Sequence, residues 1–338
     1  MYDTVFFMNH FGFYKTNLYN EIAKKQKILV IYLGETSEIR NSFFYKGEKN
    51  FEYKVINKGD YERRNIFISI LKLFFMIKKI KYNQIITMGW STPEDIFISL
   101  ISPKKKNSFI CESSSYESSL KGVKKIIKKI ILKRYTTAYV SGTPHKKIFD
   151  ILKFKGEIKI TGGVGIINRM VIKEKKDTSF SFLTIARLSD EKNLELLIDV
   201  FNKLEYNLTI VGSGPREDYL KSIANDNIKF ISFVDNKKLN DLYSQYSVFI
   251  LPSKSEPWGL VVDEAIYYQT PVIVSNMVGC NVDLVQKYDV GIIFNYNSEE
   301  ELIDAVKEIK SNWYMYYEKL KLINFDKIIS KQVDAYLK

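Results

Sequence analysis

Two carboxylates lie eight positions apart around a Pro-Trp-Gly turn, Glu256 before the turn and Glu264 after it. Apolar residues between 261 and 266 recur at helical spacing, which predicts a short helix beginning near Leu260. Glu264 could accept two hydrogen bonds from a vicinal diol such as a ribose, while the amides of Gly259 and Leu260 at a helix N-terminus favour a phosphate. Glu256, on the far side of that phosphate, could meet the hydroxyls of a sugar. The turn therefore predicts a sugar-nucleotide site, and an ordinary surface helix with flanking acids is the alternative.

The sequence around this turn resembles the C-terminal signature of glycosyltransferase family 4. The resemblance rests on Leu-Pro-Ser-Lys-Ser-Glu-Pro-Trp-Gly-Leu at 251–260 and Thr-Pro-Val-Ile-Val-Ser-Asn at 270–276, and it extends over roughly residues 180–310. It implies a GT-B architecture, in which two Rossmann-like α/β domains with parallel sheets face each other across a cleft. It also implies transfer of a hexose from a nucleoside-diphosphate sugar, most often a UDP-sugar, with retention of configuration.

Upstream of the turn, Arg187 and Lys192 follow the strand-like segment 180–185 in the order typical of the family. In the family such a pair holds the donor diphosphate. The chemistry requires fixed cations there, because the leaving diphosphate gains negative charge as the glycosidic bond breaks. The resemblance therefore assigns catalytic roles to Arg187, Lys192 and Glu256, and donor binding to Gly259, Leu260 and Glu264. Solvated charges in a strand-to-helix connection are the alternative for the two basic residues.

A Gly-x-Gly-Pro turn follows the strand-like segment beginning at Leu208. A dinucleotide fingerprint would need a third glycine at position 217, where the chain has Glu, so NAD binding is disfavoured. We interpret Gly212 and Gly214 as residues of a tight turn and of close packing between domains, and contact with the ligand is the alternative.

The first half departs from the family pattern at two places. Where members commonly carry a glycine-rich loop against the donor phosphates, this chain offers only Gly12, whose alternative role is that of a simple turn glycine. Where many members carry a histidine near the transferred sugar, this chain reads Cys-Glu-Ser at 111–113. Glu112 could contact acceptor or donor, or cap a helix.

Short apolar strands alternate with helical stretches in both halves, which is typical of parallel sheets covered by helices. The expected domains are an acceptor-binding domain at 1–165, a nucleotide-sugar domain at 166–324 and a helix at 325–338 that returns to the first domain, with a linker at 162–177. Strands are expected at 4–8, 27–33, 84–88, 108–111 and 137–140, and in the second half from Phe180, Leu208, Ile228, Val248, Val272 and Gly291.

Composition narrows the remaining choices. Two histidines and two cysteines among 338 residues leave no metal-ligand cluster and no disulfide framework, which favours a reduced, cytoplasmic setting. An Asp-x-Asp motif is also absent, so we expect a metal-independent reaction without cofactors other than the nucleotide sugar. No apolar run reaches the ~18 residues of a membrane span, and the longest candidate, 65–80, is interrupted by lysines. We therefore expect a protein that lies on a membrane without crossing it.

The net charge of +12 is concentrated in the first half. Residues 1–165 contain 30 Lys and Arg against 14 Asp and Glu, whereas residues 166–338 contain 21 against 25. Segment 121–134 holds seven of these cations and no acid. Its helical projection places Val123, Ile126, Ile127, Ile130 and Ile131 on one side, which we expect to be buried in the domain core. The opposite side would present Lys124, Lys125, Lys128 and Lys129 to anionic lipid headgroups, with Leu132 dipping among them, and a solvated face is the alternative.

The basic half suits a glycan or lipid-linked oligosaccharide acceptor at the inner membrane face, as in the synthesis of bacterial surface polysaccharide. A sugar-nucleotide epimerase of the same fold is one alternative, and it would convert the donor without an acceptor. A basic nucleic-acid-binding protein is another, suggested by a pI of 9.2 and 23 tyrosines. Its lysines are accompanied by no recognised nucleic-acid motif.

Overall fold

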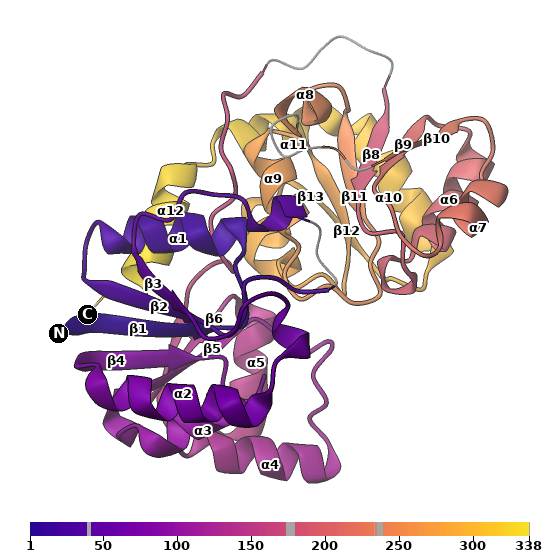
Figure 1. Ribbon diagram of the computed structural model, residues 1–338. Coiled ribbons are helices and arrows are strands. Elements are labelled where there is room, and N and C mark those ends of the chain that lie inside the picture. The colour runs from indigo at the N-terminus through magenta and orange to yellow at the C-terminus, as the bar shows by residue number, and fades with distance from the viewer. Residues whose placement is uncertain (39–41, 174–179, 233, 235–238, 338) are drawn as a thin grey trace. The chain divides into compact units, whose positions relative to one another are not determined.

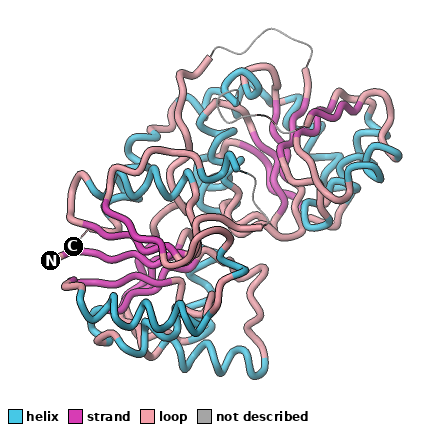
Figure 2. The backbone as a smooth tube through the Cα atoms, viewed as in Figure 1, coloured by secondary structure: helices cyan, strands magenta, loops and turns pink. Residues whose placement is uncertain are grey.

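The computed structural model describes residues 1–38, 42–173, 180–232, 234 and 239–337 (Figure 1). Residues 174–177 of the expected linker lie outside this range. The chain forms two compact units, one containing residues 1–168 together with the segment from Asp326 onward, the other containing residues 169–325. Each unit is built on its own parallel sheet, and the predicted α/β class with two Rossmann-like domains is confirmed (Figure 2).

The sheet of the first unit has seven parallel strands in the order β3-β2-β1-β4-β5-β6-β7. They are β1 (Tyr2–Met8), β2 (Ile28–Tyr32), β3 (Glu52–Val55), β4 (Tyr82–Thr87), β5 (Asn107–Cys111), β6 (Thr137–Val140) and β7 (Glu157–Ile160). Thr4 lies opposite Ile28 in the β1–β2 register, and Val5 opposite Ile85 in the β1–β4 register. All residues of β2 and β5 are buried, as expected for strands covered on both faces.

Helices cover both faces of this sheet. They are α1 (Phe13–Ala23), α2 (Ile66–Lys79), α3 (Pro93–Ile101), α4 (Gly122–Leu132), α5 (Thr143–Leu152) and α12 (Phe325–Asp334), with short 3₁₀ turns η1 (Ser42–Tyr45), η2 (Tyr61–Arg63) and η3 (Lys104–Lys106). The strand order runs outward from β1 in both directions, so right-handed crossovers place α1 on the face opposite α2, α3, α4 and α5. The end of the chain packs on the α1 face, where Tyr336 stacks on Tyr139 with ring centroids 4.8 Å apart.

The sheet of the second unit has six parallel strands in the order β10-β9-β8-β11-β12-β13. They are β8 (Phe182–Ile185), β9 (Leu208–Val211), β10 (Ile228–Ile231), β11 (Val248–Leu251), β12 (Val272–Ser275) and β13 (Gly291–Phe294). The helical elements are η4 (Asp190–Lys192), α6 (Leu194–Leu204), α7 (Glu217–Ser222), α8 (Leu239–Tyr243), α9 (Leu260–Tyr267), the π-helix η6 (Asn281–Gln286), α10 (Glu299–Ser311) and α11 (Trp313–Lys321). The order of strands reverses between β8 and β11, which is where ligands bind in such sheets.

Every predicted strand is present, but β3 and β7 were not predicted from the sequence. Both are four-residue edge strands that alternate charged with apolar residues and are largely exposed. Short, charged edges protect a sheet from pairing with other chains, and for the same reason they lack the apolar run that marks an inner strand.

The predicted orientation of α4 is wrong. Val123, Ile126, Ile127 and Ile130 are 50–71% exposed, whereas Lys125, Lys128 and Lys129 are partly buried and Lys124 alone of the four lysines is exposed. Leu132, expected among the lysines at the surface, is buried with Ile131 in the core beneath α4 and α5. The helix joins that core only through its last turn, so the apolar stripe has no protein surface to cover it in the described chain. No helix in the described ranges combines the length and the apolar character that crossing a bilayer requires.

Candidate functional site

The loop after β8 carries Arg187 and Lys192 and is fixed by its neighbours. The Leu188 amide donates to the Ser213 carbonyl at 3.0 Å, and the Asn193 side-chain amide donates to the carbonyls of Pro252 and Tyr296 at 3.1 and 2.7 Å. Asn193 adopts the left-handed conformation with φ 57°, which an asparagine tolerates better than most residues. These bonds tie the loop to the segments that follow β9, β11 and β13.

Gly212 and Gly214 help to hold the loop after β8, because they allow close backbone contacts within the second unit. A Cβ on Gly212 would stand 1.9 Å from the Ala186 carbonyl oxygen, and one on Gly214 would stand 2.4 Å from that of Leu188. The two glycines allow the turn after β9 to lie directly against the loop after β8.

Lys192 and Glu256 meet in an ion pair. The Lys192 Nζ lies 2.5 Å from a Glu256 carboxylate oxygen, and the two side chains are only 17% and 16% exposed. The backbone of Glu256 is held in turn by the segment after β12, because its amide donates to Met277 and its carbonyl accepts from Gly279 at 2.9 Å. Strands β8 and β11 are neighbours, so residues 64 positions apart converge at the carboxyl edge of the sheet.

The Pro-Trp-Gly turn leads directly into α9, which begins at Leu260 as predicted. Gly259 has φ 102°, a conformation that favours glycine, and it precedes the amides of the first helical turn. Trp258 is buried, and its indole N–H donates to an Asp263 carboxylate oxygen at 2.6 Å. Burial raises the pKa of Asp263 to about 7, and the indole donor opposes that rise.

Glu264 lies on α9 and is 5% exposed. Burial raises its pKa to about 8, with a further contribution from Asp263 and opposition from the Tyr243 hydroxyl 3.5 Å away. A large fraction of this carboxyl is therefore protonated at neutral pH in the unliganded protein. Arg187, in contrast, is exposed, and within the described ranges no ion pair or side-chain hydrogen bond holds it.

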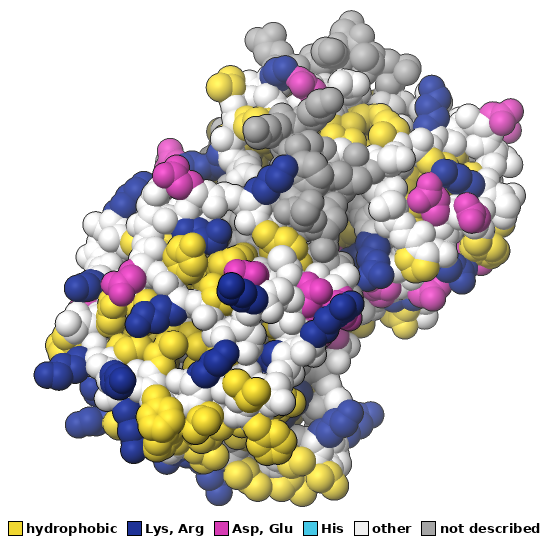
Figure 3. Space-filling model, in the orientation of Figure 1, with side chains coloured by type: hydrophobic (Ala, Val, Ile, Leu, Met, Phe, Trp, Pro, Cys, Tyr) yellow, Lys and Arg dark blue, Asp and Glu magenta, His cyan; other side chains and the backbone are white. Residues whose placement is uncertain are grey.

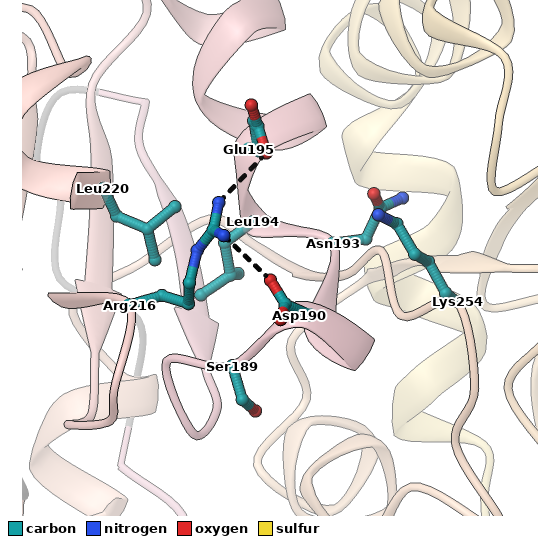
Figure 4. A pocket seen from close by; sticks show the side chains of 8 residues that line it. All are labelled: Ser189, Asp190, Asn193, Leu194, Glu195, Arg216, Leu220 and Lys254. Atoms are coloured by element: carbon teal, nitrogen blue, oxygen red, sulfur yellow. Dashed lines mark hydrogen bonds and ion pairs between the residues drawn. The ribbon is translucent and has the colours of Figure 1, made fainter.

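A small pocket beside η4 is lined by side chains for which no role was predicted from the sequence. Its lining residues are Ser189, Asp190, Asn193, Leu194, Glu195, Arg216, Leu220 and Lys254 (Figure 4). Arg216 lies between Asp190 and Glu195, with contacts of 3.1 and 3.3 Å, so it braces η4 (Figure 4). Lys254 is an exposed cation two residues before Glu256. The sequence feature that could have pointed to a role for Arg216 is its position directly after the Gly-x-Gly-Pro turn.

Gly12 and Glu112 lie in the first unit, after β1 and β5. Gly12 precedes α1 with extended φ of −164°, and a Cβ there would come within 3.1 Å of the Phe44 ring, so close packing accounts for the glycine. Glu112 forms an ion pair with Lys15, 2.5 Å apart, and Lys15 is buried in the first turn of α1. Lys15 could not be predicted from the sequence, because a lone lysine in a helix is ordinarily a solvated residue.

The sequence was compared with family models and with curated proteins. Residues 167–323 match the family model Glycosyl transferases group 1, which covers nearly the whole second unit. Among curated relatives, an uncharacterised glycosyltransferase of Methanocaldococcus jannaschii is 30% identical over 49% of this chain and 42% of its own length. One of Haemophilus influenzae is 24% identical over 88% of this chain and 87% of its own. An uncharacterised protein in the cps region of Klebsiella pneumoniae is 24% identical over 85% and 78%.

Solved structures extend the similarity to the whole chain. The lipopolysaccharide outer core galactosyltransferase WaaB matches with a TM-score of 0.71 at 11% identity, covering 98% of both chains. HepE of Anabaena, solved in complex with UDP-glucose, matches with a TM-score of 0.67 at 13% identity over 98% of this chain and 96% of that one. The two Rossmann-like units share the GT-B fold of these structures, and the second unit is similar to the group 1 glycosyl transferases.

Proposed function

We propose that this protein is a glycosyltransferase that moves a hexose from a UDP-sugar to a glycan or lipid-linked oligosaccharide, with retention of configuration, in the synthesis of bacterial surface polysaccharide. The observation that carries the donor assignment is the Lys192–Glu256 pair at the switch point between β8 and β11, directly before the N-terminus of α9. HepE, a structural neighbour, was solved with UDP-glucose, and relatives include a protein from a cps region, which support the donor and the pathway class.

In this proposal the second unit holds the donor. The amides of Gly259 and Leu260 and the cations Arg187 and Lys192 bind the diphosphate and stabilise the charge that develops as the glycosidic bond breaks. Glu264 binds the ribose diol, and Glu256 turns from Lys192 to the sugar hydroxyls. The leaving phosphate accepts the proton of the acceptor hydroxyl, so the reaction needs no base from these residues. Gly12 and Glu112 remain proposed contacts of the first unit, with donor phosphate and with acceptor.

We propose further that the reaction needs no metal ion and occurs in the cytoplasm at the inner face of the cell membrane. Basic side chains already supply positive charge at the diphosphate site, which supports the first point. The basic first unit, with 33 Lys and Arg against 16 Asp and Glu, supports contact with an anionic surface. Chelation with EDTA should leave turnover unchanged, and restoration of a lost activity by Mg²⁺ would contradict metal independence.

A panel of nucleotide sugars tests the function directly. The UDP-sugar that raises the melting temperature, with no rise from the same sugar on GDP, identifies the donor, and a ligand at one hundred times its Kd stabilises by about 2.7 kcal/mol. That donor incubated alone should persist, whereas an epimerase would convert it. Anomeric analysis of the product formed with an acceptor then decides between retention and inversion. Binding to RNA or DNA without any nucleotide-sugar shift would overturn the proposal.

A further inference from the structure

One side of the first unit exposes large apolar side chains on three successive helices. They include Phe67, Leu71 and Phe75 on α2, Leu100 on α3, and Ile126 and Ile130 on α4, each between 55% and 85% accessible. In Figure 3 these helices carry a gathering of apolar side chains, with Lys and Arg around it. We call this the α2–α4 surface.

The three helices form one continuous surface. Helices α2 and α3 pack against each other on the same face of the sheet. Arg134, just beyond α4, donates to the carbonyls of Ser99, Leu100 and Ser102 at 3.0, 3.3 and 3.0 Å, so it fastens the end of α4 to the end of α3. The apolar side chains therefore belong to one face, and a face of this kind in contact with water marks an interaction site.

Charge decides which partner the surface fits. Residues 65–111 contain seven lysines and two acids, and both acids, Glu94 and Asp95, are buried. Residues 118–149 contain no acid at all. Exposed cations around the apolar side chains include Lys72, Lys78, Lys104, Lys105, Lys124 and Lys133. A second copy of the chain would oppose lysines to lysines, whereas a layer of lipid phosphates above hydrocarbon matches both the charged rim and the apolar centre.

We propose that the α2–α4 surface docks on an anionic phospholipid bilayer, with Phe67, Ile126 and Ile130 entering the headgroup layer and the surrounding lysines contacting lipid phosphates. This rests on the membrane location given under the proposed function and reverses the expected orientation of α4. The isoleucines face the lipid. Half-buried Lys128 instead lies over the protein, with its Nζ 4.9 Å from the centre of the Trp90 ring.

Sedimentation of the full chain with vesicles tests this inference. Phosphatidylcholine vesicles containing phosphatidylglycerol should bind the protein, pure phosphatidylcholine should bind it far less, and salt should weaken binding. The double variant Ile126→Ser/Ile130→Ser should bind roughly a hundredfold more weakly, about tenfold for each side chain withdrawn from lipid. Lys124→Gln should cost about fivefold. The control Leu322→Ser changes a residue of the second unit that is 84% accessible, more exposed than either isoleucine, and should bind like wild type.

Two results would overturn the inference. One is unchanged vesicle binding by both the isoleucine variant and Phe67→Ser, with circular dichroism showing that they are folded. The other is a wild-type dimer in gel filtration that the isoleucine variant disperses while neither protein binds vesicles. The vesicle assay contains no donor or acceptor, so its outcome does not depend on whether the protein transfers a glycosyl group. A UDP-sugar melting shift on the same preparations reports on the proposed function alone.

Discussion

Glu264 is a residue whose proposed role depends on a proton. Its carboxyl is buried beside Asp263, and its pKa is raised to about 8, so the folded protein retains a proton that the unfolded chain loses near 4.5. Folding therefore takes up a proton between these two values, and this contribution to stability declines as the pH rises from about 4.5 to about 8. A bound diol would favour the ionised form, because a carboxylate can accept hydrogen bonds from both hydroxyl groups.

Glu264→Gln should remove that pH dependence and weaken donor binding. We expect a flatter plot of melting temperature against pH, with a residual decline that ends near pH 7, where Asp263 titrates. Loss of the charged acceptor should cost about 1–3 kcal/mol of UDP-sugar affinity. The affinity for the UDP-sugar should rise from pH 6 to pH 8 in wild type and should not change with pH in the variant. Parallel pH profiles for the two proteins would exclude Glu264 from the donor site.

Arg187 separates function from stability, because it is exposed and held by no partner within the described ranges. Arg187→Ala should therefore change the free energy of unfolding by less than about 0.5 kcal/mol, while turnover falls by about 100-fold or more through loss of a cation at the leaving group. Arg63→Ala is the control: its side chain is 76% exposed in the first unit and forms surface ion pairs with Glu38 and Asp60, so turnover should be unchanged and the free energy of unfolding should fall only slightly. Steady-state kinetics and denaturant titration measure both, and full activity of Arg187→Ala would remove its catalytic role.

At the scale of elements, the site depends on how tightly the loops after β8, β9 and β11 pack together. Gly212 has φ 144°, and a Cβ there would collide with the Ala186 carbonyl. Gly212→Ala should therefore cost about 3 kcal/mol or more, from the steric conflict added to backbone strain. Gly59→Ala has the same kind of backbone strain, with φ 75°, but open space around it, and should cost about 1 kcal/mol. Equal melting temperatures for the two variants would show that the loop packing is dispensable.

The Trp258–Asp263 bond links the turn to α9. Trp258→Phe leaves the buried Asp263 carboxyl without its indole donor, so we expect a loss of about 1–3 kcal/mol and a further rise of the Asp263 pKa. Asp263→Asn, alone and combined with Trp258→Phe, completes a double-mutant cycle measured by denaturant unfolding. A coupling energy near zero would mean that the bond contributes nothing to the turn.

Local sequence pattern predicted the inner strands and the start of α9, since these elements are fixed by apolar runs and by a glycine before a helical repeat. It could not predict that Lys192 pairs with Glu256, because that contact depends on β8 and β11 being neighbours in the sheet. The roles of Lys15 and Arg216 depend in the same way on distant partners. For α4 the periodicity separated the isoleucines at 126, 127 and 130 from the lysines but placed Leu132 on the wrong side, and a helical projection does not say which face the rest of the protein covers.

At the scale of the whole molecule, the two units differ in charge and in how the chain builds them. The second unit has 18 Lys and Arg against 23 Asp and Glu, the opposite sign to the first. It is formed by one continuous segment, whereas the core of the first unit is completed by the end of the chain. Tyr336 is 1% exposed there and lies 5.8 Å from the Phe6 ring as well as against Tyr139.

Tyr336→Ala should destabilise the first unit by about 3–5 kcal/mol, because it leaves a cavity between residues from both ends of the chain. Calorimetry should then show an earlier transition for one unit and an unchanged transition for the other. Tyr314→Ala, at a tyrosine 69% exposed, should leave both transitions in place. A uniform shift of the whole profile would mean that the two units unfold as one.

The divided construction of the first unit also has a consequence for translation. Residues 169–325 are synthesised between Tyr139 and Tyr336, the ring that completes the packing around Phe6 and Tyr139. The hydrophobic interior of the first unit therefore stays open on the ribosome until the whole of the second unit has been made.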